Sequence, residues 1–178
     1  ANSRADVDRE TLEMMKAAGC RLLCVGVESG SQAILDGIKK GISLDRIRKF
    51  FKDARRVGIL VHGCFMVGNR GEDRRSMEET LAFAEELNPD TAQFFPLMLY
   101  PGTEAYRLAR EEGNILTEDF AQWLTDEGLH HCVLNLPGLT NKDLVGFCDR
   151  ARRDFYLRPR YVGLKLRQVL FHPSELRR

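Results

Sequence analysis

Polar and small residues directly follow the apolar runs of this chain, where a ligand could be bound. Glu28 and Ser29 come after the apolar run at 20–27, and Gly68 comes after the run at 59–67. Small residues let the backbone approach a ligand closely, and free N–H groups at a helix start favour oxygen-rich ligands. Arg4 precedes the first expected helix and would stand at the end of any strand before it. Taken singly, each such turn is more often structural, and Glu28 could simply support the start of a helix; the order and spacing of the set are what favour a ligand site.

Alternating helices and strands would position these residues. Strands are expected at 20–27, 59–67 and 91–100, and helices at 7–18, 32–40, 43–57 and 74–87. This alternation is typical of βαβ units with a parallel sheet, in which ligands bind at the carboxyl ends of the strands. We therefore expect Arg4, Glu28, Lys40 and Gly68 to converge at one rim.

The last part of the chain is less regular. Helices are expected at 103–112, 117–127 and 141–154, and Pro159 is expected to end that region. The sequence thus predicts two parts, an α/β part at 1–115 and a mostly helical C-terminal extension at 116–178. No internal repeat is apparent.

Composition indicates an ordinary globular protein or a piece of one. The 178 residues are 43% hydrophobic and 30% charged, with a net charge of +1, which does not favour nucleic acid as a partner of the whole chain. The arginine-rich stretch at 150–178 is interpreted as a solvated helix face or a fraying basic tail, with an acidic partner as the alternative. No run approaches the roughly 18 apolar residues of a membrane span. Five scattered cysteines favour the reducing cytoplasm.

The cysteines and histidines do not predict a metal site. Cys20 and Cys24 lie on or beside an expected buried strand, so we expect both to pack in the core. Cys64 would face the interior of a barrel, where core packing is again the expected role. His130 and His131 are adjacent, and adjacent side chains on a strand or helix point apart.

An ordered set of motifs gives the sequence a family resemblance. It contains Ser-Arg-Ala-Asp at 3–6, Gly-Val-Glu-Ser-Gly-Ser-Gln at 26–32, Gly-Ile-Leu-Val-His-Gly-Cys-Phe-Met-Val-Gly at 58–68 and Tyr-Pro-Gly-Thr-Glu-Ala-Tyr at 100–106. From Ser3 to about Ala109 the chain resembles the radical S-adenosylmethionine (SAM) superfamily, especially enzymes with a cobalamin-binding domain before the barrel. It looks most like the branch with anaerobic magnesium-protoporphyrin IX monomethyl ester oxidative cyclases and hopanoid-biosynthesis enzymes.

The resemblance implies the later half of a partial (βα)6 TIM-like barrel and an enzyme as the parent protein. In that family a [4Fe–4S] cluster on a Cys-x3-Cys-x2-Cys motif binds SAM and cleaves it reductively to start radical chemistry, such as oxidative cyclisation or methylation. The cofactors supply that chemistry, and the protein supplies orientation and exclusion of water. Cobalamin is a further cofactor in some relatives. The implied substrate is a small molecule of the tetrapyrrole or isoprenoid kind.

The resemblance also assigns roles to single residues. Arg4 would face the SAM side of the mouth, and Glu28 would contact the ribose of SAM. Ser29 would support the turn after Glu28, and Lys40 would contact the SAM carboxylate. Val67 and Gly68 would lie beside the adenine and complete the cofactor-binding set.

Departures from the family pattern predict an incomplete site. The chain has no Cys-x3-Cys-x2-Cys and no Gly-Gly-Glu segment, so strands one to three are expected to precede it in the parent. We therefore expect the isolated chain to be inactive and to lack cluster ligands. The segment Gly68-Asn-Arg-Gly-Glu-Asp73 replaces the common Gly-x-Pro-Gly-Glu-Thr. A half barrel would leave a strand edge near Ser3 exposed, which predicts self-association.

Three alternatives stay open at this point. The chain could be a non-catalytic interaction fragment. It could belong to an RNA-modifying radical SAM methylthiotransferase, for which only the arginine-rich tail gives a hint. It could also be an ordinary TIM-barrel aldolase or phosphate-binding enzyme, which would need a catalytic lysine at a strand end or a glycine-rich phosphate loop.

Overall fold

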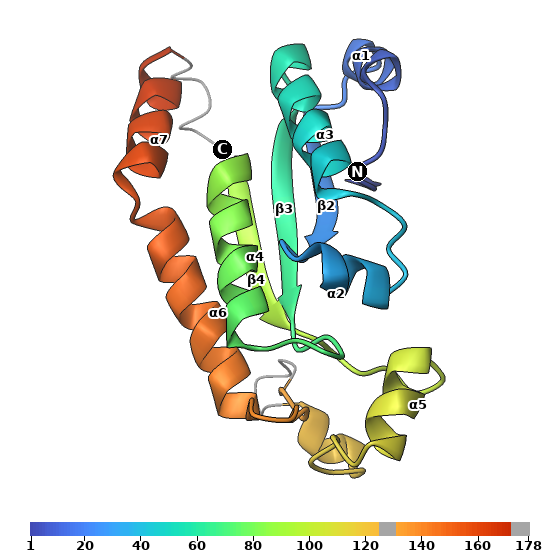
Figure 1. Ribbon diagram of the computed structural model, residues 1–178. Coiled ribbons are helices and arrows are strands. Elements are labelled where there is room, and N and C mark those ends of the chain that lie inside the picture. Colours follow the sequence, from blue (N-terminus) through green and yellow to red (C-terminus); the bar gives the residue numbers. More distant parts are fainter. Residues whose placement is uncertain (125–130, 172–178) are drawn as a thin grey trace.

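The computed structural model describes residues 1–124 and 131–171, and these residues form a parallel sheet covered by helices (Figure 1). The sheet order is β1-β2-β3-β4, and each neighbouring pair is parallel. The strands are β1 (Asn2–Ser3), β2 (Leu22–Glu28), β3 (Leu60–Val67) and β4 (Thr91–Pro96). The expected α/β class and parallel sheet are thus confirmed, and Arg4 does follow a strand.

Four helices lie in the connections between these strands. They are α1 (Arg9–Ala17), α2 (Gln32–Gly37), α3 (Leu44–Val57) and α4 (Arg74–Leu87). Side chains of Asp8, Ser43 and Asp73 cap the starts of α1, α3 and α4 by accepting a backbone N–H of the first turn. Gly58, with a φ of 79°, ends α3 in the left-handed region that glycine adopts without strain.

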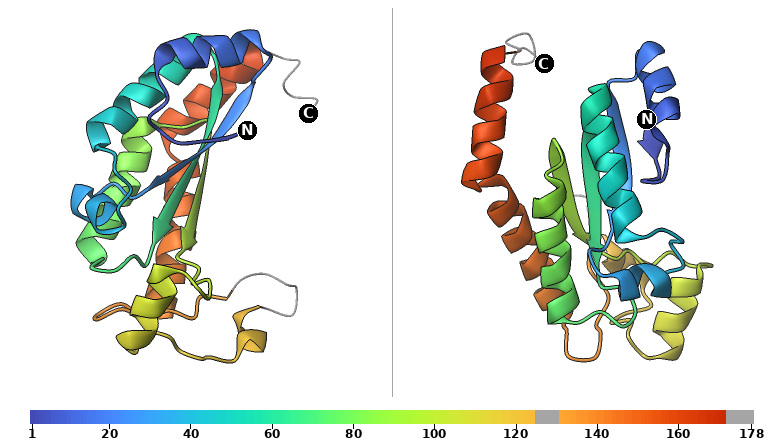
Figure 2. Two further views of the ribbon diagram at one scale, coloured as in Figure 1. Left: turned by 90° about the vertical axis from the view of Figure 1, so that its right-hand side faces the viewer. Right: turned by 45° about the horizontal axis from the view of Figure 1, so that its top comes forward.

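The two faces of the sheet differ in exposure. Helices α2, α3 and α4 lie to one side of it (Figure 2, left), and the side chains on that face are buried, among them Val25, Phe65 and Phe94. Alternate residues point the other way and are mostly half-buried. We call this second surface the open face; its residues on β2, β3 and β4 are Leu22, Cys24, Gly26, Glu28, Leu60, His62, Cys64, Met66, Thr91, Gln93 and Phe95.

The C-terminal part packs against the sheet and contributes to the same hydrophobic core. It contains α5 (Glu104–Glu111), the 3-10 helix η1 (Phe120–Trp123), α6 (Asn141–Tyr156) and α7 (Pro159–Phe171). The ring of Phe155 lies 6.0 Å from that of Phe94. The hydroxyl of Tyr156 accepts from the backbone N–H of Ala92 at 2.9 Å and donates to its carbonyl at 2.8 Å. Helix α6 therefore covers the β4 side of the sheet.

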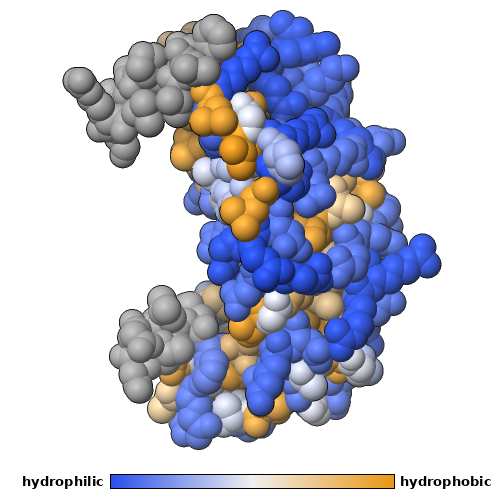
Figure 3. Space-filling model, turned by 90° about the vertical axis from the view of Figure 1, so that its left-hand side faces the viewer, coloured by the Kyte–Doolittle hydropathy of each residue, from blue (hydrophilic) through white to orange (hydrophobic). Residues whose placement is uncertain are grey.

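Helices α6 and α7 also carry exposed apolar side chains. Figure 3, seen from the left-hand side of Figure 1, shows apolar areas among a mainly polar surface. Among residues 141–167, the exposed large apolar side chains are Val145, Val162 and Leu166 in the helices and Leu157 between them. No helix among the described residues is long and apolar enough to cross a membrane.

Several expected boundaries are wrong. The strand expected at 91–100 ends at Pro96. In the helix expected at 117–127, only the 3-10 turn η1 forms among the described residues, and residues 125–127 lie outside them. Pro159 does not end the helical region but begins α7, because the first position of a helix needs no N–H donor. The division at residue 115 stays a prediction.

Candidate functional site

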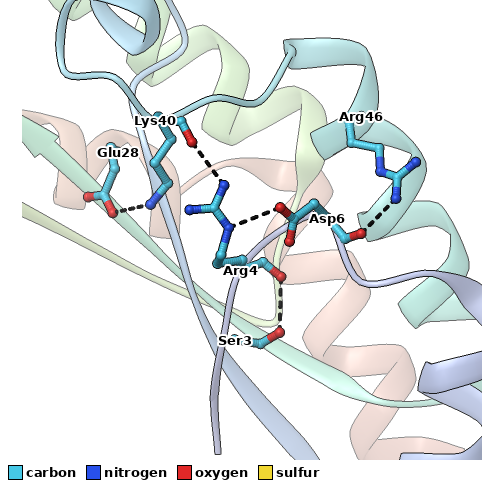
Figure 4. A network of polar contacts seen from close by, with 6 residues as sticks. All are labelled: Ser3, Arg4, Asp6, Glu28, Lys40 and Arg46. Carbon is cyan, nitrogen blue, oxygen red and sulfur yellow. Dashed lines mark hydrogen bonds and ion pairs between the residues drawn. The ribbon is translucent and has the colours of Figure 1, made fainter.

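Three of the expected residues meet at the carboxyl ends of β1 and β2 (Figure 4). The Nζ atom of Lys40 lies 2.8 Å from Oε1 of Glu28, and their side chains are only 17% and 18% exposed. Arg4 follows β1, and its Nη2 donates to the Lys40 carbonyl at 2.9 Å. Its Nε donates to Asp6 Oδ2, also at 2.9 Å. We call Arg4, Glu28 and Lys40 the rim cluster.

The local backbone of β2 makes the rim cluster possible. The pairing of β2 with β3 has an irregularity between Gly26 and Glu28, and Glu28 has a φ of 70°. A Cβ atom at Gly26 would lie 2.4 Å from Glu28 Oε1 and 3.2 Å from Lys40 Nζ. Glycine at this position therefore leaves the space in which the two charged groups pair.

Ser29 lies behind the rim cluster and not on its surface. Its hydroxyl is fully buried and lies 3.1 Å from Oγ1 of Thr80 in α4, which also accepts from the Gly30 N–H at 3.0 Å. The backbone N–H of Ser31 donates to the Ser29 hydroxyl. Ser29 thus holds the turn after β2 against α4, and its part in a cofactor site stays a prediction.

Val67 and Gly68 end β3 at the same end of the sheet, and the structure gives them different surroundings. The Val67 side chain is fully buried. Gly68 has a φ of 96°, and a Cβ atom there would lie 3.2 Å from the side chains of both Leu134 and Leu144. The C-terminal part therefore covers the Cα of Gly68, and no hydrogen bond or ion pair of the described side chains joins Gly68 to the rim cluster.

Glu72 is a residue of this turn that sequence reasoning quoted without assigning it a role. Its Oε2 accepts from the Gly68 N–H at 2.5 Å and from the Asn69 N–H at 3.0 Å. Its Oε1 is buried and has no hydrogen-bond partner among the described residues. Burial outweighs the two backbone hydrogen bonds and raises the pKa of the Glu72 carboxyl to about 7.

A second group of chemically active side chains lies on the open face. Cys24, His62 and Cys64 place one ligand atom each within 4.8 Å of the others, and we call them the thiol–imidazole group. The two Sγ atoms are 3.5 Å apart. Burial, followed by the contact with Cys24, raises the pKa of the Cys64 thiol to about 12.

Sequence reasoning missed the thiol–imidazole group. The expectation that Cys24 packs in the core is wrong, because its side chain is half-buried on the open face, and Cys64 is likewise half-buried. The sequence held part of the signal, since His62 and Cys64 are two positions apart and therefore share one face of β3. Their meeting with Cys24 depends on the register of β2 and β3. The expectation that the chain lacks cluster ligands is consequently not confirmed. His130 lies outside the described residues, and His131 is exposed.

The arginines of α6 are engaged by neighbouring acidic groups. Arg150 pairs with Glu78 of α4, Arg152 pairs with Asp149, and Arg153 pairs with Asp154. Arg158, which lies between α6 and α7, donates instead to the Glu85 backbone carbonyl and to the Asn88 side-chain oxygen. This arrangement agrees with a solvated helix face that also ties α6 to α4.

Comparison with known proteins relates part of the chain to a known family. Residues 2–84 match the radical SAM superfamily. The chain is 32% identical over 163 residues to an uncharacterized methyltransferase of Pyrococcus horikoshii, covering 91% of this chain and 35% of that protein. It is 30% identical over 160 residues to the cytidylyl-2-hydroxyethylphosphonate methyltransferase of Streptomyces wedmorensis, covering 85% and 29%. The chain is therefore related to radical SAM enzymes and spans about a third of these relatives.

A solved structure supports the fold. The radical SAM methyltransferase TsrM of Kitasatospora setae, with cobalamin and a [4Fe–4S] cluster bound, superposes with a TM-score of 0.58. The match covers 67% of this chain and 24% of that protein at 23% sequence identity. At this identity the likeness concerns the fold, which is consistent with a partial radical SAM barrel.

The relatives shift the expected subtype. An anaerobic magnesium-protoporphyrin IX monomethyl ester cyclase of Cereibacter sphaeroides is 22% identical to the chain, below the values for the two methyltransferases. The expectation of an oxidative cyclase is therefore not favoured over that of a methyltransferase.

The rim cluster fits SAM better than the thiol–imidazole group fits an iron–sulfur cluster. Glu28 offers a carboxylate for ribose hydroxyls, and Lys40 offers an ammonium for a carboxylate. A cubane cluster takes its protein ligands on separate irons, on diverging bonds. The two thiols of the described group touch each other, so they suit a single metal ion.

Proposed function

We propose that the chain is the later half of the barrel of a radical SAM methyltransferase and lines the SAM side of its site. The rim cluster is the observation that carries this proposal. It collects two cations and a carboxylate at the carboxyl ends of adjacent parallel strands, where ligands of such sheets bind. When bound, SAM and its cluster would supply the radical chemistry, and residues of this chain would orient SAM.

Each residue of the rim cluster has a separate part in the proposal. One carboxylate oxygen of Glu28 would stay paired with Lys40, and the other would accept hydrogen bonds from the ribose hydroxyls. Lys40 is held by Glu28 and attracts the SAM carboxylate as a point charge. Arg4 holds the backbone of Lys40 in place by donating a hydrogen bond to the Lys40 carbonyl. Ser29, Val67 and Gly68 shape the neighbouring turns, and the backbone after Val67 would lie beside the adenine.

The proposal divides the chain into barrel residues 1–115 and an extension at 116–178. Strands one to three, with the cluster cysteines, would come from elsewhere in the parent, and the isolated chain would not cleave SAM. The substrate would be a small molecule, a tetrapyrrole or isoprenoid by the family resemblance. The paired arginines of α6 do not favour the RNA-modifying alternative.

SAM binding tests the rim cluster directly. We expect the 178-residue chain to bind SAM with a Kd of roughly 1 mM, because half a site gives only part of the binding energy. Glu28→Gln should weaken this binding about tenfold or more, since a hydrogen bond to a charged group contributes about 1.5–3 kcal/mol. Isothermal titration calorimetry and a thermal melt of each variant measure binding and folding.

A matched control uses an exposed ion pair outside the rim cluster. Glu104 pairs with Lys39 at 2.9 Å, and both side chains are largely exposed. Glu104→Gln makes the same chemical change and should leave SAM binding unaltered. Equal affinity of the Glu28→Gln variant and the unaltered chain, with both folded, would remove the observation on which the proposal depends.

We also propose that the isolated chain associates through β1. At the other edge of the sheet, Tyr156 binds the N–H and the carbonyl of Ala92, so α6 occupies the β4 edge. Strand β1 has only two residues and pairs only with β2. An uncovered strand edge is a template for another chain.

Light scattering at several concentrations tests this association. We expect mass to rise above 20.3 kDa with concentration. Asn2→Lys should reduce association because a lysine on an edge strand opposes edge-to-edge pairing. Asn114→Lys adds the same charge after α5 and should not reduce it. A concentration-independent monomer would contradict the proposal.

A further inference from the structure

We propose that Cys24, His62 and Cys64 bind a single thiophilic divalent cation, with zinc as the first choice, inside the open face of the sheet. The site would lie beside the rim cluster, because the Glu28–Lys40 pair fills the space over Gly26, and Gly26 pairs with Cys64. It would be distinct from any cluster motif elsewhere in the parent. It follows from the side chains of β2 and β3 alone. It therefore does not depend on the proposed SAM-related function.

The spacing of the ligand atoms suits one tetrahedral ion. With a Zn–S distance of about 2.3 Å, two thiolates on one ion lie about 3.8 Å apart. The Cys24 and Cys64 sulfurs are 3.5 Å apart, which differs from that value by a few tenths of an ångström. All three ligand atoms lie within 4.8 Å of one another, so in the proposed site side-chain rotations would bring them to a single ion.

The strand register explains why these three side chains meet. Strands β2 and β3 pair Cys24 with His62 and Gly26 with Cys64. Gly26 has no side chain of its own, so the Cys24 and Cys64 sulfurs approach each other diagonally, with the Glu28–Lys40 pair packed beside them over Gly26. The three ligands come from the central strands of the sheet, which are more rigid than loops and hold a preformed site.

Thr91 supplies the outer hydrogen bond that metal-binding histidines usually have. Its Oγ1 lies 2.7 Å from His62 Nδ1. An Nδ1–H that donates to this hydroxyl fixes the tautomer and leaves the Nε2 lone pair for the ion. Two thiolates balance the charge of a divalent cation, so the loaded site would add no net charge to the half-buried face.

Three protein ligands leave one coordination position open. Structural zinc sites usually have four protein ligands, whereas sites that bind water or a substrate atom have three. The open face carries Gln93 opposite Cys64 in the β3–β4 register, and Gln93 is exposed. The fourth position would thus be reached from the side of the sheet that the helices leave uncovered.

Cobalt substitution tests the site on the intact 178-residue chain. The reduced, metal-free protein is titrated with Co²⁺, and we expect thiolate-to-cobalt absorption that saturates at one ion per chain. Zn²⁺ should displace the cobalt. Zn²⁺ should also protect Cys24 and Cys64, but not Cys20, from alkylation, which peptide mass spectrometry resolves.

Variants separate the site from general metal binding. Cys24→Ser and Cys64→Ser should each lose roughly 100-fold or more in Zn²⁺ affinity, and Thr91→Val should lose about tenfold by releasing His62. Cys20→Ser is the matched control and should keep the absorption. Circular dichroism checks folding, and Thr91→Val covers the case in which a cysteine variant does not fold.

Three results would overturn the proposal. The first is the absence of stoichiometric cobalt absorption in the unaltered chain. The second is absorption that persists in folded Cys64→Ser protein or disappears in Cys20→Ser protein. The third is incorporation of about four irons and four sulfides per chain on reconstitution, lost in Cys64→Ser protein, which would assign these residues to a cluster.

Discussion

Gly30→Ala is expected to destabilise the protein by about 3 kcal/mol, because the added methyl group has no space. A Cβ atom at Gly30 would lie 2.4 Å from the Glu79 carbonyl oxygen, 2.6 Å from Phe83 Cβ and 2.8 Å from Thr80 Cα. Two of these atoms belong to the α4 backbone, so the whole helix must move away from the end of β2. Urea unfolding measures the loss.

The same substitution should also disturb the rim cluster. Ser29 and Gly30 are hydrogen-bonded to Thr80, and a displaced α4 would pull on the turn that carries Glu28. We therefore expect Gly30→Ala to weaken SAM binding even at temperatures where the protein is folded. Loss of stability without any change in binding would show that the turn is positioned independently of α4.

Gly146→Ala is the matched control for this prediction. Gly146 lies within α6, and a Cβ atom there would meet nothing within 4 Å. Alanine favours a helix interior over glycine by about 1 kcal/mol, so this variant should be slightly more stable than the unaltered chain. An unchanged urea midpoint for Gly30→Ala would contradict the close packing of α4 on β2.

The elements that the sequence predicted well are those with local signals. Helix α3 begins after Ser43 and ends at Gly58 as expected, because a side-chain cap and a left-handed glycine act within a few residues. Thr103 similarly caps α5. The parallel sheet followed from the alternation of elements, and the meeting of Arg4, Glu28 and Lys40 followed from the parallel sheet.

The features that the sequence did not predict depend on contacts between distant residues. The sequence assigned Gly30 no packing role, whereas the backbone of α4 approaches it closely. Tyr156 reaches Ala92 across 64 positions of the chain. A proline can either follow the end of a helical region or occupy the first position of a new helix. The residues around Pro159 fit both cases, and the packing of α7 distinguishes them.

The thiol–imidazole group could not be predicted by considering each residue by itself. Cysteine on an apolar strand is usually a core residue, and that expectation was applied to each cysteine by itself. The relation between Cys24 and His62 depends on the register of β2 and β3, which the sequence does not state. A register is set by packing of the buried face, so it becomes visible only with the whole sheet.

Glu72 should make the protein less stable as the pH rises from about 4.5 to about 7. Its pKa is raised from 4.5 to about 7 in the folded state, so between these values the folded protein binds more protons than the unfolded chain. The free energy of unfolding therefore decreases with rising pH across this window and levels off above it. A shift of this size corresponds to about 3 kcal/mol.

Glu72→Gln isolates this contribution. The amide oxygen can still accept from the Gly68 and Asn69 N–H groups, but the side chain no longer ionises. The unaltered chain should thus lose about 3 kcal/mol of unfolding free energy relative to the variant when the pH rises from 4.5 to 8. Urea unfolding at several pH values measures the slope of each protein.

Glu112→Gln controls for the loss of a carboxylate in the same region. Glu112 pairs with the exposed Arg70, directly beside the turn that contains Glu72. Asp143, with a pKa of about 2, affects stability only below the window and is unchanged in both variants. A pH slope in Glu72→Gln equal to that of the unaltered chain would mean that the Glu72 carboxylate is stabilised in the fold, and that its buried Oε1 has found a partner such as a bound cation or water.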